Sequence, residues 1–143
     1  MTDTRQDFSR KMIVAINEHL GSWELTNVVG HIAAFLGNKM RQPFDTGDCF
    51  VSRDGFKFPR NSQYPIVALK ASEKELRELT KRVAESNTVW VIYTRDMIDL
   101  TDDQELEKRF ASKDSGSMNL LGIGIFGTKQ ELKPLTDSFP LWK

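Results

Sequence analysis

Residues that could carry out chemistry occur in two places in this sequence. Arg95 and Asp96 directly follow Thr88–Thr94, a β-branched and aromatic run that favours a strand covered on both faces. Asn27 and His31 lie one turn apart on a predicted helix. Because a histidine titrates near neutral pH, His31 could move a proton while Asp96 orients water or an amine. Each pair also has a structural interpretation. Asp96 could cap a loop or pair with Arg95, and Asn27 and His31 could simply be solvated side chains at helical spacing.

A strand–helix–strand pattern determines where Asp96 should lie. Ile66–Lys70 is an apolar run long enough for a buried strand, and Ser72-x-x-Glu75 is a capping box that starts a helix. The apolar stripe of that helix consists of Leu76, Leu79 and Val83. Strand, helix and strand in succession predict a βαβ unit with two adjacent parallel strands. Ligands bind beyond the carboxyl ends of such strands, so we expect a site at Thr94-Arg95-Asp96.

Another strand and helix precede this unit. Lys11–Ile16 is the first predicted strand, and Ser22 is the predicted N-cap of a helix from Trp23 to about Leu36, which Gly37-Asn38 ends. The apolar face of this helix consists of Leu25, Val28, Val29, Ile32 and Leu36. The opposite flank carries Glu24, Asn27 and His31 at i, i+3 and i+7. Trp23 could stack on a ligand ring or cover the sheet edge.

Residues 40–63 are the least regular part of the chain, which we interpret as an insert with a small β-ribbon. Asp54-Gly55 is typical of a two-residue type I′ hairpin turn. That turn pairs Arg53 with Phe56 and Val51 with Phe58, which would place Val51, Phe56 and Phe58 on one face. Cys49 has no nearby histidine and is predicted to be structural.

The C-terminal part supplies the remaining elements. Thr101-x-x-Gln104 is a capping box for a short helix whose inward contacts should be Leu106 and Phe110. Asn119–Phe126 is the last strand, and its glycines indicate that the backbone approaches another element closely. Thr128-x-x-Glu131 caps a final short helix.

Length and composition limit the class of protein. The 143 residues, 39% hydrophobic and 28% charged, fit a single domain over 1–143 in which 1–9 form a flexible N-terminus. The net charge is zero, so the balance indicates neither nucleic acid nor an anionic membrane as a partner. With one cysteine, no signal-peptide pattern and no apolar run near the ~20 residues that span a bilayer, we expect a cytoplasmic protein. No ligand spacing predicts a metal, and we expect no cofactor.

The order of the elements resembles a known family. The strand, long helix and βαβ unit, followed by Leu121-Gly122-Ile123-Gly124 and the tail segment Leu135–Leu141, are similar to the type 2 peptidyl-tRNA hydrolase fold. The chain looks more like an uncharacterised bacterial family that shares this fold, over roughly Lys11 to Trp142, apart from the insert and Thr101–Ser117. The resemblance implies an α/β fold with three α/β/α layers and a mixed four-stranded sheet.

The resemblance also implies site residues. The hydrolases have an Asp at the end of the third strand in an Arg-Asp-Ala-Gly-like motif, which Arg95-Asp96 matches, although Met97–Leu100 replaces the rest. Their first long helix begins with glycine- and lysine-rich residues, whereas Leu20–Asn27 has no lysine. A threonine beside their last strand corresponds to Asn119. One functional position therefore matches, and the basic surface does not.

The charge pattern around this position argues against tRNA. From Asp96 to Glu107 the chain has six carboxylates and no Lys or Arg. Affinity for a phosphate backbone comes from cations, so such an acidic rim would repel tRNA. A solvated helix start, where acids suit the helix dipole, is the alternative explanation for the carboxylates.

Three hypotheses about function follow, and whether the chain is an enzyme stays open. The first is binding or hydrolysis of a small cationic or neutral ligand at the carboxyl ends of the parallel strands. In it Asp96 and His31 are catalytic, and the ligand-binding residues are Trp23, Asn27, Arg95 and Asn119. The second is retained peptidyl-tRNA hydrolase activity centred on Asp96. The third is a non-catalytic interaction module that uses either the Val51/Phe56/Phe58 ribbon or the Gly30/Ala34 back of the long helix as a homodimer surface.

Overall fold

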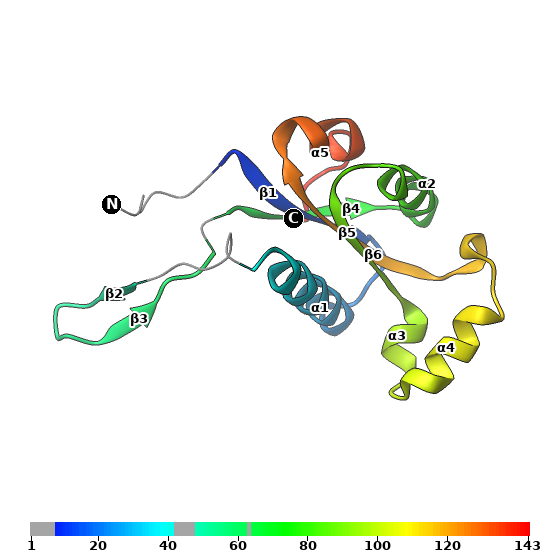
Figure 1. Cartoon of the computed structure of the whole chain (residues 1–143), viewed down its shortest axis with the longest axis horizontal. Helices are drawn as coiled ribbons and strands as arrows, with labels where there is room; N and C mark the ends of the chain where they lie inside the picture. The colour runs from blue at the N-terminus through cyan, green and yellow to red at the C-terminus, as the bar shows by residue number, and fades with distance from the viewer. Residues whose placement is uncertain (1–7, 42–47, 63) are drawn as a thin grey trace.

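The computed structural model describes residues 8–41, 48–62 and 64–143. Its centre is a four-stranded mixed sheet in the order β4-β1-β6-β5 (Figure 1). The strands are β1 (Arg10–Asn17), β4 (Ile66–Ala71), β5 (Val89–Thr94) and β6 (Leu120–Thr128). β1 is parallel to β4, and β6 is antiparallel to both β1 and β5. The mixed four-stranded sheet predicted from the sequence is therefore confirmed.

The expected neighbouring of β4 and β5 is wrong. The two strands run in the same direction, but β1 and β6 lie between them, so they occupy opposite edges of the sheet. β1 and β6 are buried along almost their whole length and therefore take the centre. β5 is an edge strand whose Trp90 is exposed, so it is not covered on both faces as expected.

Helices cover both faces of the sheet. α1 (Ser22–Met40) lies on one face, and α2 (Glu73–Ala84) and α5 (Lys129–Thr136) lie on the other (Figure 1). The apolar layer under α1 contains Met12, Val14, Ile16, Val28, Ile32, Leu36, Leu121 and Phe126. The layer under α2 and α5 contains Ile13, Ala15, Leu69, Leu76, Leu79, Ile123, Ile125 and Leu132. Alternate residues of β1 thus enter opposite layers, as the two-residue period of a strand requires. β6 alternates in the same way from Gly122 onward, after a register shift opposite Tyr93 and Thr94.

Two glycines of β6 allow α1 to lie directly on the sheet. A Cβ at Gly122 would be 2.8 Å from Val28 Cγ1. A Cβ at Gly124 would be 2.1 Å from Ile32 Cγ2 and 3.0 Å from Leu36 Cδ1. No side chain other than hydrogen fits at these positions, which confirms the prediction that glycines mark a close approach.

Helix boundaries depart from prediction at three points. α1 begins at Ser22, because Gly21 is its N-cap and donates its N–H to Glu24 Oε1 at 3.2 Å. It continues through Gly37, which costs only about 1 kcal/mol inside a helix, and ends where Arg41 takes a φ of 49°. α4 (Asp103–Ala111) is capped by Asp102 instead of Thr101.

The capping boxes predicted for α2 and α5 are confirmed. Ser72 and Glu75 cap α2, and Thr128 and Glu131 cap α5, each by reciprocal side-chain and backbone bonds. Leu106 and Phe110 of α4 are half-buried, and Phe110 packs against the α2–α5 layer. The short helices α3 (Arg95–Asp99) and η2 (Ser115–Ser117) flank α4.

The outer edge of β4 is covered by the C-terminal tail. Lys70 donates its backbone N–H to Pro140 O at 2.8 Å, and Trp142 donates to Ala68 O at 2.9 Å. Leu141 forms a bridge with Leu69 between these two bonds. The tail thus acts as a short additional strand that protects an edge from pairing with another chain.

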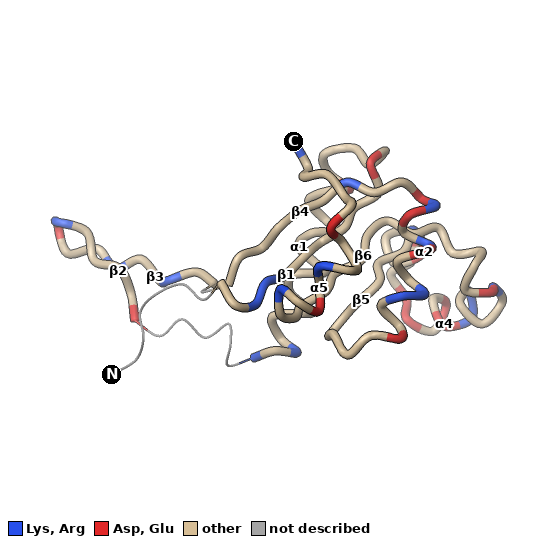
Figure 2. Tube along the Cα trace, turned by 90° about the horizontal axis from the view of Figure 1, so that it is seen from above, with Lys and Arg blue, Asp and Glu red and all other residues tan. Residues whose placement is uncertain are grey.

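The β-ribbon exists, but its predicted register is wrong. β2 (Cys49–Val51) and β3 (Lys57–Pro59) pair Phe50 with Phe58 and Val51 with Lys57. A three-residue loop, in which Gly55 has a φ of 89°, replaces the two-residue turn, and Ser52 and Phe56 close it. A slip of one residue moves Val51 to the face opposite Phe56 and Phe58. The ribbon projects from the body of the molecule (Figures 1 and 2).

Some predictions fall partly outside the described residues. Residues 1–7 of the expected flexible N-terminus, and residues 42–47 and 63 of the insert, are not described. Within the part that is described, no helix has the length and apolar content that crossing a membrane requires.

Replacing Gly124 by alanine should destabilise the protein by about 1–3 kcal/mol or more, because the new methyl group overlaps Ile32 and the helix must move away from β6. Urea denaturation measures the loss. Gly30→Ala is the matched control, since nothing lies within 4 Å of a Cβ there, and it should stabilise α1 by about 0.5–1 kcal/mol. Equal effects of the two substitutions would contradict the close-packing argument.

Candidate functional site

The polar flank of α1 faces the carboxyl end of β5. The Tyr93 hydroxyl donates a hydrogen bond to Asn27 Oδ1 at 3.2 Å. The His31 ring stacks on the Tyr93 ring with centroids 5.3 Å apart and planes 15° apart. Arg95 forms an ion pair with Glu24, one turn before Asn27. Glu24, Asn27 and His31 therefore form one seam with β5 and the residue after it, which we call the α1–β5 seam.

Burial and pairing set the electrostatics of this seam. The hydrogen bond from Arg95, and then the Gly21 N–H, hold the pKa of the Glu24 carboxyl below its ordinary value. Burial raises the pKa of the Tyr93 hydroxyl, because the phenolate would lose its hydration. The seam accordingly contains one paired acid, one paired base and a neutral phenol, and the charges of Glu24 and Arg95 cancel.

Asp96 is held by two cations that come from α4 and the loop after it. Its Oδ1 is 3.3 Å from Arg109 Nη1 and its Oδ2 is 2.7 Å from Lys113 Nζ, and the residue is only 5% exposed. The expectation of a corner without cations is wrong, because α4 lies beside α3 (Figure 1) and brings Arg109, with Lys113 from the loop after it, to Asp96. Each oxygen of this carboxylate already accepts a bond from a cation.

The structure brings some predicted site residues together and separates others. Asn27 and His31 meet at Tyr93, and Arg95 joins them through Glu24. No hydrogen bond or ion pair between described residues links His31 to Asp96. Asn119 is exposed and contributes its backbone carbonyl, which accepts the Arg95 N–H at 2.9 Å. Trp23 is 64% exposed at the start of α1.

Sequence reasoning missed two residues at this end of the sheet, Tyr93 and Asn17. Tyr93 connects two of the predicted residues but looked like an ordinary strand aromatic. Asn17, buried at the end of β1, donates to Leu120 O at 3.3 Å and accepts the His19 N–H at 3.0 Å. Thr94, which the expected site at the end of β5 included, is buried, and its hydroxyl has no hydrogen-bond partner among the described residues. A polar residue directly at the end of an apolar strand was the available signal for Asn17.

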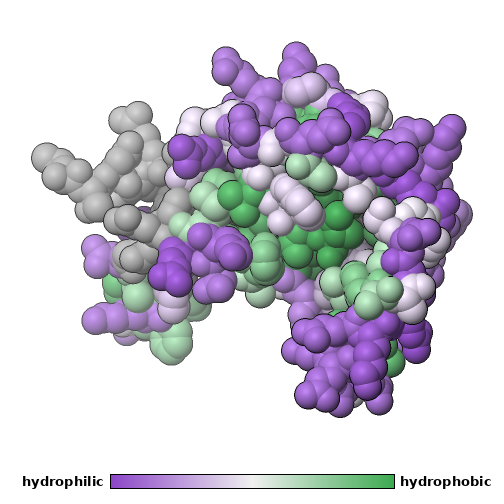
Figure 3. Space-filling view, turned by 45° about the vertical axis from the view of Figure 1, so that its right-hand side comes forward, coloured by the Kyte–Doolittle hydropathy of each residue, from purple (hydrophilic) through white to green (hydrophobic). Residues whose placement is uncertain are grey.

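The face of the molecule that Figure 3 shows is divided by polarity. In Figure 3 an apolar area lies between hydrophilic surfaces, with a hydrophilic lobe below it. Described large apolar side chains that remain exposed on the body include Trp23 and Trp90.

The comparisons with known proteins identify a family but no activity. A family model described as "Protein of unknown function (DUF2000)" matches residues 10–143. A solved structure of a protein of unknown function, Atu0240 from Agrobacterium tumefaciens strain C58, superimposes with a TM-score of 0.83 and 18% identity, covering 96% of this chain and 100% of that chain. No curated protein matches the chain. The expected uncharacterised family is thus found, and the relation to peptidyl-tRNA hydrolases stays a prediction.

Replacing Tyr93 by phenylalanine should cost about 0.5–1.5 kcal/mol near neutral pH, because the hydrogen bond to Asn27 is lost. The raised pKa of Tyr93 means that the folded chain keeps a proton that the unfolded chain releases above about pH 10. The difference in the free energy of unfolding between the wild type and Tyr93→Phe is therefore complete below pH 10. It shrinks as the pH rises through the pKa of Tyr93 in the folded protein. Urea denaturation of both proteins from pH 8 to 11 measures this difference, and a constant difference would contradict it.

Proposed function

Because the chain belongs to the DUF2000 family of proteins of unknown function, we propose its function from the site itself. The protein binds a small, neutral, flat ligand against the α1–β5 seam, at the carboxyl end of β5. The observation that carries this proposal is the stacking of His31 on Tyr93 beside Asn27.

The spacing of side chains on α1 supports such a ligand. Trp23, Asn27 and His31 follow one another at i, i+4 and i+8, so they form one stripe along the helix. Trp23 and His31 are exposed, and each offers a ring face. The Asn27 carbonyl accepts from Tyr93, which leaves its amide N–H groups as donors. The stripe therefore combines two stacking surfaces with a hydrogen-bonding group between them.

The charge of the seam favours a neutral ligand over a cationic one. The Glu24 carboxylate is already paired with Arg95, and the Asp96 carboxylate with Arg109 and Lys113. A cationic ligand would have to displace one of these partners. A neutral ligand leaves both ion pairs intact.

Binding is a better supported function than hydrolysis. A hydrolytic mechanism would use Asp96 to orient water or an amine and His31 to move the proton. Both Asp96 oxygens are occupied by cations, and His31 makes its ring contact with Tyr93. In a hydrolase the substrate would have to bridge Asp96 and His31. Binding requires only Asn27, His31 and Tyr93, which already contact one another.

Retained peptidyl-tRNA hydrolase activity is the second candidate, because Arg109 and Lys113 do bring basic side chains to Asp96. These cations are paired with the carboxylate, so we expect no cleavage of a peptidyl-tRNA by the wild-type protein. Turnover by the wild type that Asp96→Asn abolishes would instead establish the hydrolase. The homodimeric module stays a prediction that rests on the ribbon, where Phe50, Val51, Phe56 and Phe58 are each more than half exposed.

A titration with nicotinamide, a flat neutral amide, tests the binding proposal. We expect it to shift the NMR signals of the Trp23 indole N–H and the Asn27 side-chain amide, with weak affinity. Trp23→Ala should weaken binding about tenfold, since stacking on one aromatic ring contributes about 0.5–1.5 kcal/mol beyond the apolar area that it buries.

Trp90→Ala is the matched control, because Trp90 is also exposed but lies on β5 outside the stripe. It should leave the affinity unchanged. Shifts that are absent from α1, or that survive Trp23→Ala at full size, would refute the proposed site.

A further inference from the structure

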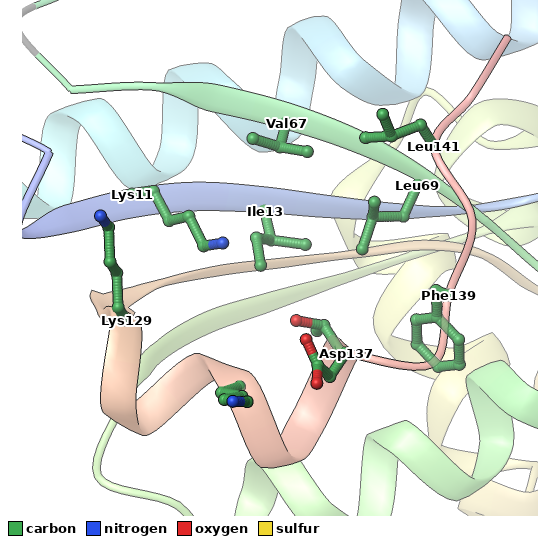
Figure 4. Close-up of a pocket in the computed structure, with 10 residues that line it drawn as sticks. Lys11, Ile13, Val67, Leu69, Lys129, Asp137, Phe139 and Leu141 are labelled. Atoms are coloured by element: carbon green, nitrogen blue, oxygen red, sulfur yellow. The ribbon is translucent and has the colours of Figure 1, made fainter.

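A separate cavity of about 380 Å³ lies on the opposite face of the sheet from α1. α5 and the C-terminal tail form one wall, and β1 and β4 form the other (Figure 4). Its volume falls within the range of about 300–1,000 Å³ that is usual for small-molecule pockets. None of the seam residues lines it.

The two ends of this cavity differ in chemistry. Lys11 and Lys129 lie at one end, and Phe139 and Leu141 lie at the other (Figure 4). Ile13, Val67 and Leu69 form an apolar floor along the sheet between these ends. An elongated molecule with one charged end and one apolar end would match this arrangement.

The lysines of the cavity are available to a ligand. Lys11, Lys129 and Lys133 line it together with one acid, Asp137. Among the described residues none of these lysines has an ion pair or a hydrogen bond from its side chain. Cations that share a hollow with a single carboxylate repel one another, and an anionic group placed between them would relieve that repulsion.

We propose that this cavity binds an anionic amphiphile, a small molecule with a carboxylate or phosphate head and a short apolar body. The head lies between Lys11 and Lys129, and the body lies on Ile13, Val67 and Leu69 toward Phe139. Burial of the body removes apolar surface of both molecules from water. The charged head gains ammonium hydrogen bonds, which are stronger than those between neutral groups.

Asp137 sets a limit on the ligand. It follows the end of α5 and is one of the residues that line the cavity (Figure 4). A second anionic group at that position would be repelled, so the ligand carries its charge at one end only. The cavity therefore selects amphiphiles with a single anionic group over dicarboxylates.

Titration with octanoate, followed by the backbone amide signals of β1, β4 and α5, tests this inference. We expect octanoate to shift these signals, while octanol and octyltrimethylammonium at the same concentration bind at least about tenfold more weakly. Acetate should also bind more weakly, because it has no apolar body. Octyl phosphate in place of octanoate shows which head the lysines prefer.

Substitutions separate specific binding from general attraction. Lys11→Gln/Lys129→Gln should raise the Kd for octanoate about tenfold or more with little change in thermal unfolding, because neither side chain is buried. Lys74→Gln/Lys108→Gln removes the same charge from α2 and α4, outside the cavity, and should leave the Kd unchanged. If the first pair does not fold, Lys129→Gln alone should still weaken binding severalfold.

Three results would overturn the inference. They are equal weakening by the two pairs of substitutions, equal binding of octanoate and octyltrimethylammonium, and octanoate shifts confined to the α1–β5 seam. The Trp23→Ala protein should bind octanoate normally, which keeps this cavity distinguishable from the seam.

Discussion

The contact between α1 and the glycines of β6 determines the arrangement of the rest of the structure. Val28, Ile32 and Leu36 reach the strand only because Gly122 and Gly124 have no side chains. This contact fixes the depth and the rotation of α1. The residues on its flank, Asn27 and His31, are therefore held at the height of Tyr93 on the neighbouring strand. Packing in the apolar layer thus positions a polar site outside it.

A second constraint is the burial of Asp96. A carboxylate that is 5% exposed must be paired, because an isolated buried charge is costly. Arg109 and Lys113 supply that pairing, and they tie α4 and the following loop to the end of β5. Asp96, which both the topology and the family resemblance marked as functional, therefore has a structural role. The sequence offered an ion pair with Arg95 as the structural alternative, and the structure pairs Asp96 with Arg109 and Lys113 instead.

The two candidate sites use opposite faces of one sheet and different chemistry. The α1–β5 seam has paired charges, exposed rings and an amide, which suits a neutral molecule. The α5 cavity has lysines that form no ion pair with another described residue, and they lie over an apolar floor, which suits an anionic molecule. Alternation along β1 explains how one strand contributes to both layers, since Ile13 faces the cavity and Met12 faces α1.

The sequence by itself determined the local elements: the strands, the amphipathic helices, the capping boxes at Ser72 and Thr128, and the meaning of the β6 glycines. It also indicated that Glu24, Asn27 and His31 share a flank. Tertiary structure alone decided that β4 and β5 lie apart, that the ribbon slips by one residue, and that basic side chains reach Asp96. The physical reason is range: periodicity and capping depend on residues within a few positions, whereas strand neighbours and ion pairs depend on contacts between distant segments.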